Sequence, residues 1–239
     1  MLLTSFVFVC LFAVIHFLSA YFDHIPAGIR YRLGSISGGI TIAYVFSITL
    51  PNLSTTQGTV EKSTSSNLVD MLNSHGFLVA MLGLVMNYGL EMMQSAYREE
   101  NPRLHVRAAI PVAYYVLFNI ITGYLLLHGQ IGNAQETIFY FTALGIYLFS
   151  SDLQLSQESP RFFRRIGRWL LLVGVLGGWL LGTTFSLGAG TLSSLYAFVS
   201  GGIIYHAIKG QMQEQGKLAA FLYFCIPCIL YTIIWIMVK

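Results

Sequence analysis

The chain has 239 residues, of which 55% are hydrophobic and only 10% are charged. About a quarter of the residues of a soluble domain are charged, so the composition excludes an ordinary soluble domain and indicates a polytopic membrane protein. The formal net charge of +3 is too small to suggest binding to nucleic acid. The three cysteines lie in apolar runs, which excludes a secreted disulfide framework; they are Cys10, Cys225 and Cys228.

Eight apolar runs follow one another along the chain, and each is long enough to cross a bilayer. Lipid cannot satisfy backbone N–H and C=O groups, so we expect eight transmembrane helices in one all-α membrane domain over residues 1–239. The first run lacks a basic start, so we expect a retained helix and no cleaved signal. The runs cover residues 2–22, 33–53, 71–94, 106–128, 136–153, 167–186, 189–209 and 217–238.

Basic residues are sorted between the joints that separate these runs. The odd-numbered joints and their edges hold eleven of the thirteen Lys and Arg residues: Arg30, Arg32, Arg98, Arg103, Arg107, Arg161, Arg164, Arg165, Arg168, Lys209 and Lys217. The even-numbered joints hold only Lys62, and the second joint is Ser/Thr-rich, as expected for an external loop. The positive-inside rule therefore predicts cytoplasmic odd joints and two external termini in the plasma (inner) membrane.

Small residues four positions apart recur in several runs, a spacing that allows two helix backbones to approach closely in lipid. Such ridges are Gly34 with Gly38, Ser35 with Gly39, Gly174 with Gly178 and Gly182, and Ser193 with Ala197 and Gly201. The tetrapeptide SGGI occurs at residues 37–40 and again at 200–203. The two copies lie in runs of opposite direction, which favours an inverted repeat of runs 1–3 and 6–8, an arrangement typical of transporters.

Two short motifs resemble the ZIP (Zrt/Irt-like) family of metal transporters and the bacterial membrane proteins related to it. The stretch FSITLPN at residues 46–52 is similar to the end of that family's second helix, with Pro51 kept. The stretch FNIITG at residues 118–123 is similar to the fourth helix, with Asn119 and Gly123 kept. The resemblance implies an eight-helix plan with both ends outside, an inverted repeat and a substrate path between the repeats.

The metal-binding positions of these motifs are changed. Ile48 and Phe118 stand where the family has histidines, Asn52 where it has glutamate, and Thr122 where it has aspartate. The fifth run, which in the family carries histidines and glutamates, retains only Asp152. Zinc and related ions need imidazole, carboxylate or thiolate ligands, so we expect a degenerate site, no bound metal and no resident cofactor.

Polar residues within apolar runs are candidates for a substrate path. Asn119 is the first candidate, with an interhelical hydrogen bond as its alternative role; Asn87 is a second buried asparagine. A group of ionisable residues falls toward the cytoplasmic side: His16, Asp23, His24, Glu91, Asp152 and His206. If they converge, they form a proton relay or an inner metal site; otherwise they lie at the interface and face water. The interface is favoured for Asp23, His24 and Asp152, which flank the predicted helix ends, whereas the others lie deeper.

Further motifs have weaker functional interpretations. The CIPC stretch at residues 225–228 has the spacing of a redox pair, but thiols within an apolar helix more often serve packing. His16 and His206 have similar depth, as a haem-ligating pair would. No histidine spacing suggests an intramembrane zinc hydrolase, and we expect no enzyme.

The sequence thus leaves two hypotheses for function. One is a transporter-like protein that carries an ion or small solute between the inverted halves. The other is a non-transporting structural or assembly subunit. The expected partners are membrane lipid and either other membrane protein subunits or a second copy of the chain.

Overall fold

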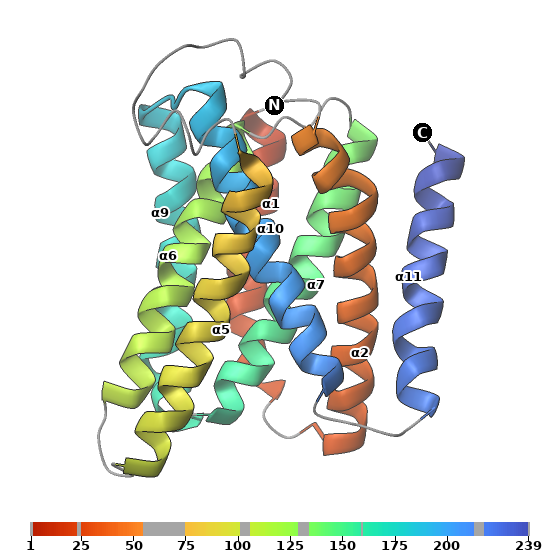
Figure 1. The fold of residues 1–239 in the computed structure, drawn as a ribbon. Coiled ribbons are helices and arrows are strands. Elements are labelled where there is room, and N and C mark those ends of the chain that lie inside the picture. The colour runs from red at the N-terminus through yellow and green to blue at the C-terminus, as the bar shows by residue number, and fades with distance from the viewer. Residues whose placement is uncertain are drawn as a thin grey trace. The chain divides into compact units, whose positions relative to one another are not determined.

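The computed structural model describes residues 2–22, 25–54, 75–100, 106–128, 134–158, 160–212 and 218–238. Within these ranges the chain is helical apart from short connections, and it contains no strand (Figure 1). The elements are α1 (Leu2–Ser19), α2 (Ala27–Tyr44), η2 (Val45–Thr49), α5 (Gly76–Glu100), α6 (Val106–His128), α7 (Ala134–Glu158), α8 (Pro160–Phe162), η3 (Phe163–Gly167), α9 (Arg168–Thr184), α10 (Ala189–Met212) and α11 (Leu218–Val238).

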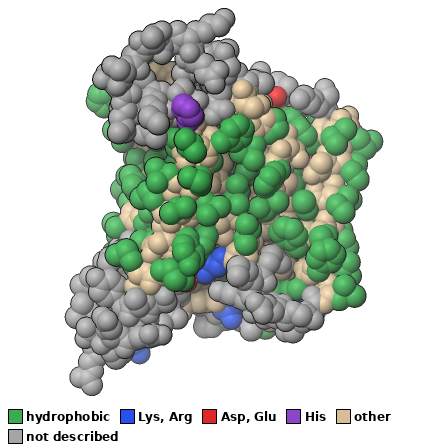
Figure 2. Space-filling view, in the orientation of Figure 1, with side chains coloured by type: hydrophobic (Ala, Val, Ile, Leu, Met, Phe, Trp, Pro, Cys, Tyr) green, Lys and Arg blue, Asp and Glu red, His purple; other side chains and the backbone are tan. Residues whose placement is uncertain are grey.

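Seven helical segments of the described chain are long and apolar enough to cross a membrane. Val112–His128, within α6, is a shorter apolar helix. Large apolar side chains remain exposed on these segments, among them Val173, Leu180 and Ile236, each at 60% exposure or more. Hydrophobic side chains also dominate the face drawn in Figure 2. Such surfaces are stable against lipid tails and unstable against water, so the chain is a multi-pass membrane protein.

One helical segment changes its hydrogen-bonding pattern within the span. Residues 27–54 are continuously helical, but Val45–Thr49 form the π-helical turn η2 between two α-helical parts. The segment begins after Pro26, whose ring fixes a backbone angle that suits a helix start. The helix continues through Pro51 to Ser54. The turn η2 therefore coincides with most of the FSITLPN stretch.

The chain divides into two compact units, which are described separately. Unit 1 consists of Met1–His24, Val85–Gly129 and Ser151–Ser186. It contains α1, α6, α9 and the C-terminal parts of α5 and α7. Unit 2 consists of Ile25–Leu84, Gln130–Ser150 and Leu187–Lys239, and it contains α2, α10, α11 and the N-terminal parts of α5 and α7.

In unit 1, α6 and α9 approach each other through glycines. A Cβ atom at Gly178 would collide with the carbonyl group of Ile120, and one at Gly123 would collide with the carbonyl oxygen of Val175. At Gly174 it would lie 3.1 Å from the Val116 carbonyl oxygen, whereas at Gly182 it would make ordinary contacts from 3.4 Å. The ridge of small residues thus faces α6, and at Gly178 a larger residue would separate the two helices.

Aromatic side chains attach α1 to α9 in the same unit. Trp179 Nε1 donates a hydrogen bond to Ser5 Oγ at 3.0 Å, and its ring packs against Phe6 with centroids 5.3 Å apart. At the other end, the Arg168 guanidinium lies over the ring of Phe17 at 5.0 Å. Arg168 thereby belongs to the helix contact as well as to the basic stretch before α9.

In unit 2, glycines place backbone against backbone at two further contacts. A Cβ atom at Gly39 of α2 would collide with the Phe224 carbonyl group on α11, and one at Gly201 of α10 would collide with the Ala80 carbonyl group on α5. Gly34 differs from the expectation, because nothing lies within 4 Å of the place where its Cβ would be. Gly38 is buried. The ridge of Ser35 and Gly39 therefore makes a close contact with α11 through Gly39.

Candidate functional site

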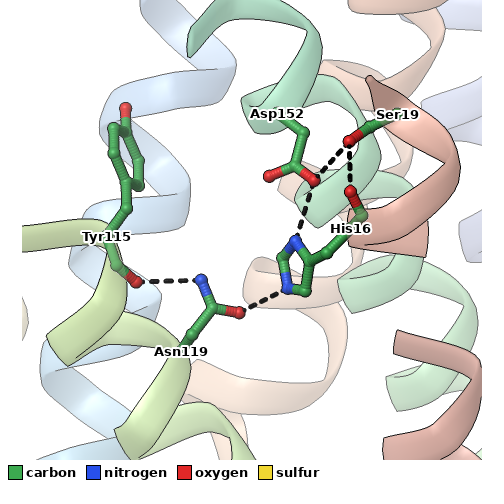
Figure 3. Close-up of polar contacts among 5 residues, drawn as sticks. All are labelled: His16, Ser19, Tyr115, Asn119 and Asp152. Atoms are coloured by element: carbon green, nitrogen blue, oxygen red, sulfur yellow. Dashed lines mark hydrogen bonds and ion pairs between the residues drawn. The ribbon is translucent and has the colours of Figure 1, made fainter. Parts of the chain in front are cut away.

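Four polar side chains from three helices meet in the interior of unit 1 (Figure 3). His16 and Ser19 come from α1, Asn119 from α6 and Asp152 from α7. The His16 Nδ1 atom lies 2.8 Å from Asp152 Oδ2, and its Nε2 atom lies 2.7 Å from Asn119 Oδ1. The His16 side chain is fully buried, and that of Asp152 is 3% exposed. We call these four residues the His16 cluster.

The local sequence explains why these side chains point inward. His16 and Ser19 are three residues apart, so they lie on the same face of α1. The Ser19 hydroxyl lies 2.9 Å from both Asp152 Oδ2 and its own helix's carbonyl oxygen at His16, and it has one proton to donate. On α7, Asp152 is buried together with the polar residues Ser151 and Ser156 and the apolar residues Leu153 and Leu155.

Asn119 has a fixed orientation within the cluster. Its Nδ2 donates a hydrogen bond to the backbone carbonyl oxygen of Tyr115, one turn earlier on α6, at 2.8 Å. A carbonyl oxygen can only accept, so the reversed amide would place two acceptors against each other. The Oδ1 atom must therefore face His16, and His16 Nε2 must carry a proton to donate to it.

The geometry does not activate Ser19 as a nucleophile. In a serine hydrolase the hydroxyl contacts the imidazole, which takes its proton, and the carboxylate lies behind the imidazole. Here the Ser19 hydroxyl contacts the Asp152 carboxylate, and both imidazole nitrogens are already engaged by other residues. Among the four residues of the cluster, no base is positioned on a nucleophile.

No metal-binding group is formed by the described residues, because no three His, Cys, Asp or Glu side chains gather there. A metal or haem iron could bind His16 only by displacing Asp152 or Asn119 from a ring nitrogen. The three cysteines are free thiols, each half-buried. The CIPC pair lies within the continuous helix α11, which includes Pro227.

The other candidate residues have contacts of their own. Glu91 is half-buried on α5 in unit 1 and makes no hydrogen bond to the cluster. His206 belongs to unit 2, where its ring packs edge-on against Tyr147 with centroids 5.7 Å apart. Asn87 is buried and donates a hydrogen bond to the Tyr114 hydroxyl. Asp23 and His24 lie outside the described residues.

Asp152 corrects the sequence interpretation. The apolar run was expected to end at residue 153, which would put Asp152 at the water interface. Instead, α7 continues to Glu158, and Asp152 is buried more than a turn before its end. Asp152 bonds to His16 and Ser19 of α1, whereas the Ser156 hydroxyl donates to the Leu153 carbonyl oxygen of its own helix. Of the six cytoplasmic-side residues, His16 and Asp152 meet.

Two participants were not anticipated from the sequence. Ser19 has a detectable signal, since it lies one helical turn after His16 on the same face. Tyr115 contributes only its backbone carbonyl oxygen, which every residue has, so no side-chain pattern could have indicated it. At the positions that resemble metal-binding motifs, Ile48, Phe118 and Thr122 are all buried.

Comparison with known proteins does not assign a family. No family model matches the chain, and no curated protein matches it. The sequence and the structure together identify an all-helical protein with several membrane-crossing helices and a buried, hydrogen-bonded histidine–aspartate cluster.

Proposed function

We propose that this chain is a transporter-like membrane protein that moves an ion or a small solute across the bilayer. The observation that carries the proposal is the His16–Asp152 contact, which is buried among membrane-crossing helices. Ionisable residues inside a membrane are rare, since each is costly to remove from water, and they usually mark substrate or proton pathways. Apolar residues of similar volume would fill the same space at a lower desolvation free energy, so packing alone does not explain the His16–Asp152 pair.

The scaffold we propose is the ZIP-like plan of eight crossings, with both termini outside the plasma (inner) membrane and an inverted repeat. Three features support it: the seven long apolar segments, the additional apolar helix Val112–His128 and the sorting of basic residues between the joints. The stretches FSITLPN and FNIITG support the relation to that family. The path would then run near the interface of the two repeats.

The transported species is a monovalent ion or a small neutral solute and not a transition metal. Transition metals bind through groups of imidazole, thiolate or carboxylate ligands. His16 uses both ring nitrogens within the protein, and Ile48 and Phe118 supply no ligand atom at the family's positions. A solute bound through hydrogen bonds or backbone oxygens needs no such group.

The proposal is tested by flux into proteoliposomes that contain the purified chain. The probes are radioactive sodium, rubidium and zinc ions, together with glycerol and urea followed by light scattering. We expect flux of a monovalent ion or a neutral solute above that of protein-free vesicles, and no zinc flux. The Asp152→Asn variant should lose most of this flux while Thr142→Val, a change on the exposed surface of α7, keeps it. Absence of flux for every probe would contradict transport.

A second function is favoured by a different observation. The polar side chains of the His16 cluster, which come from three helices, bond to one another and to backbone carbonyl oxygens, as expected for a structural element that fixes helices in place. In this case the protein is a structural or assembly subunit that binds other membrane proteins or a second copy of itself. Purification in mild detergent with mass measurement by light scattering distinguishes the cases: this function requires a stable complex together with no flux.

A further inference from the structure

We propose that His16 and Asp152 together form a binding site for one proton, and that this proton is the coupling ion of the transport proposed above. The second half rests on the proposed function, and the first half does not. The argument uses the hydrogen-bond directions within the cluster, beginning from the one atom whose role is fixed.

The fixed atom is the backbone carbonyl oxygen of Tyr115. It accepts a hydrogen bond from Asn119 Nδ2 at 2.8 Å, which directs Asn119 Oδ1 toward His16 Nε2 at 2.7 Å. Two acceptors at that distance would repel each other, so Nε2 carries a proton. The tautomer of His16 is therefore determined by the backbone of α6 (Figure 3).

A second proton must lie between His16 Nδ1 and Asp152 Oδ2, which are 2.8 Å apart. Without it, the lone pair of Nδ1 would face a carboxylate oxygen, and the enclosed pair would carry a net negative charge. With it, the pair is neutral, whether it is written as imidazolium and carboxylate or as imidazole and carboxylic acid. The Ser19 hydroxyl at Asp152 Oδ2 is compatible with both descriptions.

A third proton is disfavoured for the same reason. It would leave a positive charge within a cluster whose two titratable side chains are 0% and 3% exposed. The site therefore holds one exchangeable proton, and it can release that proton only if the cluster opens toward water. Such opening requires α1 to move away from α6 or α7, because the cluster connects these three helices.

The described residues give the pair no further ion-pair partner. On α9, Arg168 lies over the ring of Phe17, the neighbour of His16 in the chain, and makes no ion pair with Asp152. On α6, the ring of Tyr115 points away from the imidazole in Figure 3. Glu91 of α5, Cys10 of α1 and His128 of α6 make no hydrogen bond to the pair. The arginines of α8 and η3 are exposed. Among the described residues, the ion-pair partner of Asp152 is therefore His16.

Asp152→Asn provides the matched variant. An asparagine side chain has the same shape, and its Nδ2 can donate to His16 Nδ1, so the variant satisfies every hydrogen bond without the exchangeable proton. In water, an aspartic acid has a pKa of about 3.9 and a histidine about 6.5. At a pH of about 8 the unfolded wild-type chain therefore leaves both groups deprotonated, while the folded chain holds one proton between them.

The decisive measurement is the number of protons released when the full chain in detergent micelles is unfolded at a pH of about 8. In weak buffer with an indicator dye, wild type should release one proton more per chain than Asp152→Asn. The protons released by all other groups are the same in both chains and cancel when the two values are subtracted. The sign follows from linkage: the folded state binds the extra proton, so stability falls as the pH rises. The unfolding equilibrium constant of wild type should rise about tenfold per pH unit relative to the variant. A difference of zero would overturn the proton site.

If Asp152→Asn does not fold, nitrogen NMR of histidine-labelled wild type in lipid nanodiscs gives the same answer, with His16→Gln used only to assign the signal. At a pH of about 8, both His16 nitrogens should show hydrogen-bonded protons, or one shared proton at Nδ1. A His16 ring with no proton at or shared with Nδ1 would contradict the site.

Coupling is tested separately with the solute identified by the flux panel. A pH gradient should accelerate its uptake in wild type, whereas the small uptake that remains in Asp152→Asn should not respond to the gradient. If uptake by wild type does not respond to the gradient, the proton has a structural role and the proposal of coupling is wrong. If no solute crosses the membrane, the proposal of transport is wrong, and the number of protons released on unfolding still tests the proton site.

Discussion

His16 shows how a single side chain can connect three membrane helices. Its two ring nitrogens point in different directions, one to Asp152 on α7 and one to Asn119 on α6, while its backbone belongs to α1. In a lipid environment, hydrogen bonds of this kind supply part of the association energy that the hydrophobic effect supplies in water. Removing any one partner leaves a buried polar atom without its hydrogen bond.

Asn119→Leu should destabilise the protein by about 1–3 kcal/mol, because it leaves His16 Nε2–H without an acceptor in an enclosed site. Leucine has a similar volume, so the effect of an added cavity is small. The midpoint of unfolding in detergent measures the change, with Thr142→Val as the control, since its hydroxyl bonds only to the Ile138 carbonyl oxygen of its own helix. Equal midpoints for the two variants would show that the Asn119 hydrogen bond contributes nothing.

At the residue scale, the sequence could select the participants but could not pair them. Apolar surroundings identify His16, Asn119 and Asp152 as unusual, and helical periodicity places Ser19 beside His16. The pairing depends on helix rotation and on how far α7 extends, and neither follows from a count of apolar residues. Glu91 was an equally reasonable candidate by sequence, and it makes no hydrogen bond to the cluster.

At the scale of elements, the contact between α6 and α9 depends on which face of α9 carries glycines and so has no side chains. Gly174, Gly178 and Gly182 lie four residues apart and face α6, whereas nothing lies within 4 Å of a Cβ placed at Gly177. The spacing in the sequence therefore predicted a contact face on this helix. It could not predict which helix would lie against that face, because many apolar surfaces fit a glycine ridge equally well.

Gly178→Ala should destabilise the protein by about 1–3 kcal/mol, since the new methyl group forces α6 and α9 apart at the Ile120 carbonyl group. Gly177→Ala is the matched control one residue away. It adds the same methyl group to open space and should leave the midpoint of thermal unfolding unchanged or slightly raised, because alanine favours helix. If both variants shift the midpoint equally, the close approach of α6 and α9 is not a determinant of stability.

At the scale of the whole molecule, composition alone is enough to indicate a helical membrane protein, because lipid permits few other backbone arrangements. The boundaries of the runs were less accurate: α2 begins at Ala27 where residue 33 was expected, and α7 extends to Glu158 where residue 153 was expected. The error at α7 arises because a polar residue within a helix, here Asp152, can be satisfied by a neighbouring helix. A hydropathy profile depends on the polarity of each residue and contains no information about the group on another helix to which that residue bonds.

The proposed topology predicts which sites can be reached from outside the cell. In a variant without Cys10, Cys225 and Cys228, a single cysteine at Lys62→Cys should react with a membrane-impermeant maleimide in intact cells. A cysteine at Arg164→Cys should react only after the cells are opened, because the arginine-rich joints are cytoplasmic by the positive-inside rule. Labelling of both sites from outside would contradict eight crossings with external termini.

The π-helical turn η2 has a consequence for insertions and deletions in this chain. Hydrogen bonds from residue i to i+5 enclose one residue more than those of an α-helix, so η2 absorbs an additional residue within a helix that otherwise keeps α periodicity. Phe46, 57% exposed, lies in this turn. Deleting it would restore the α pattern and leave residues 50–54 on the face that they now occupy, so the buried Leu53 would keep its place in the cluster with Val79 and Ala80. A deletion in the α-helical part of the segment would instead rotate the following residues by about 100°, so η2 is the place in this helix where the core of unit 2 tolerates the loss of one residue.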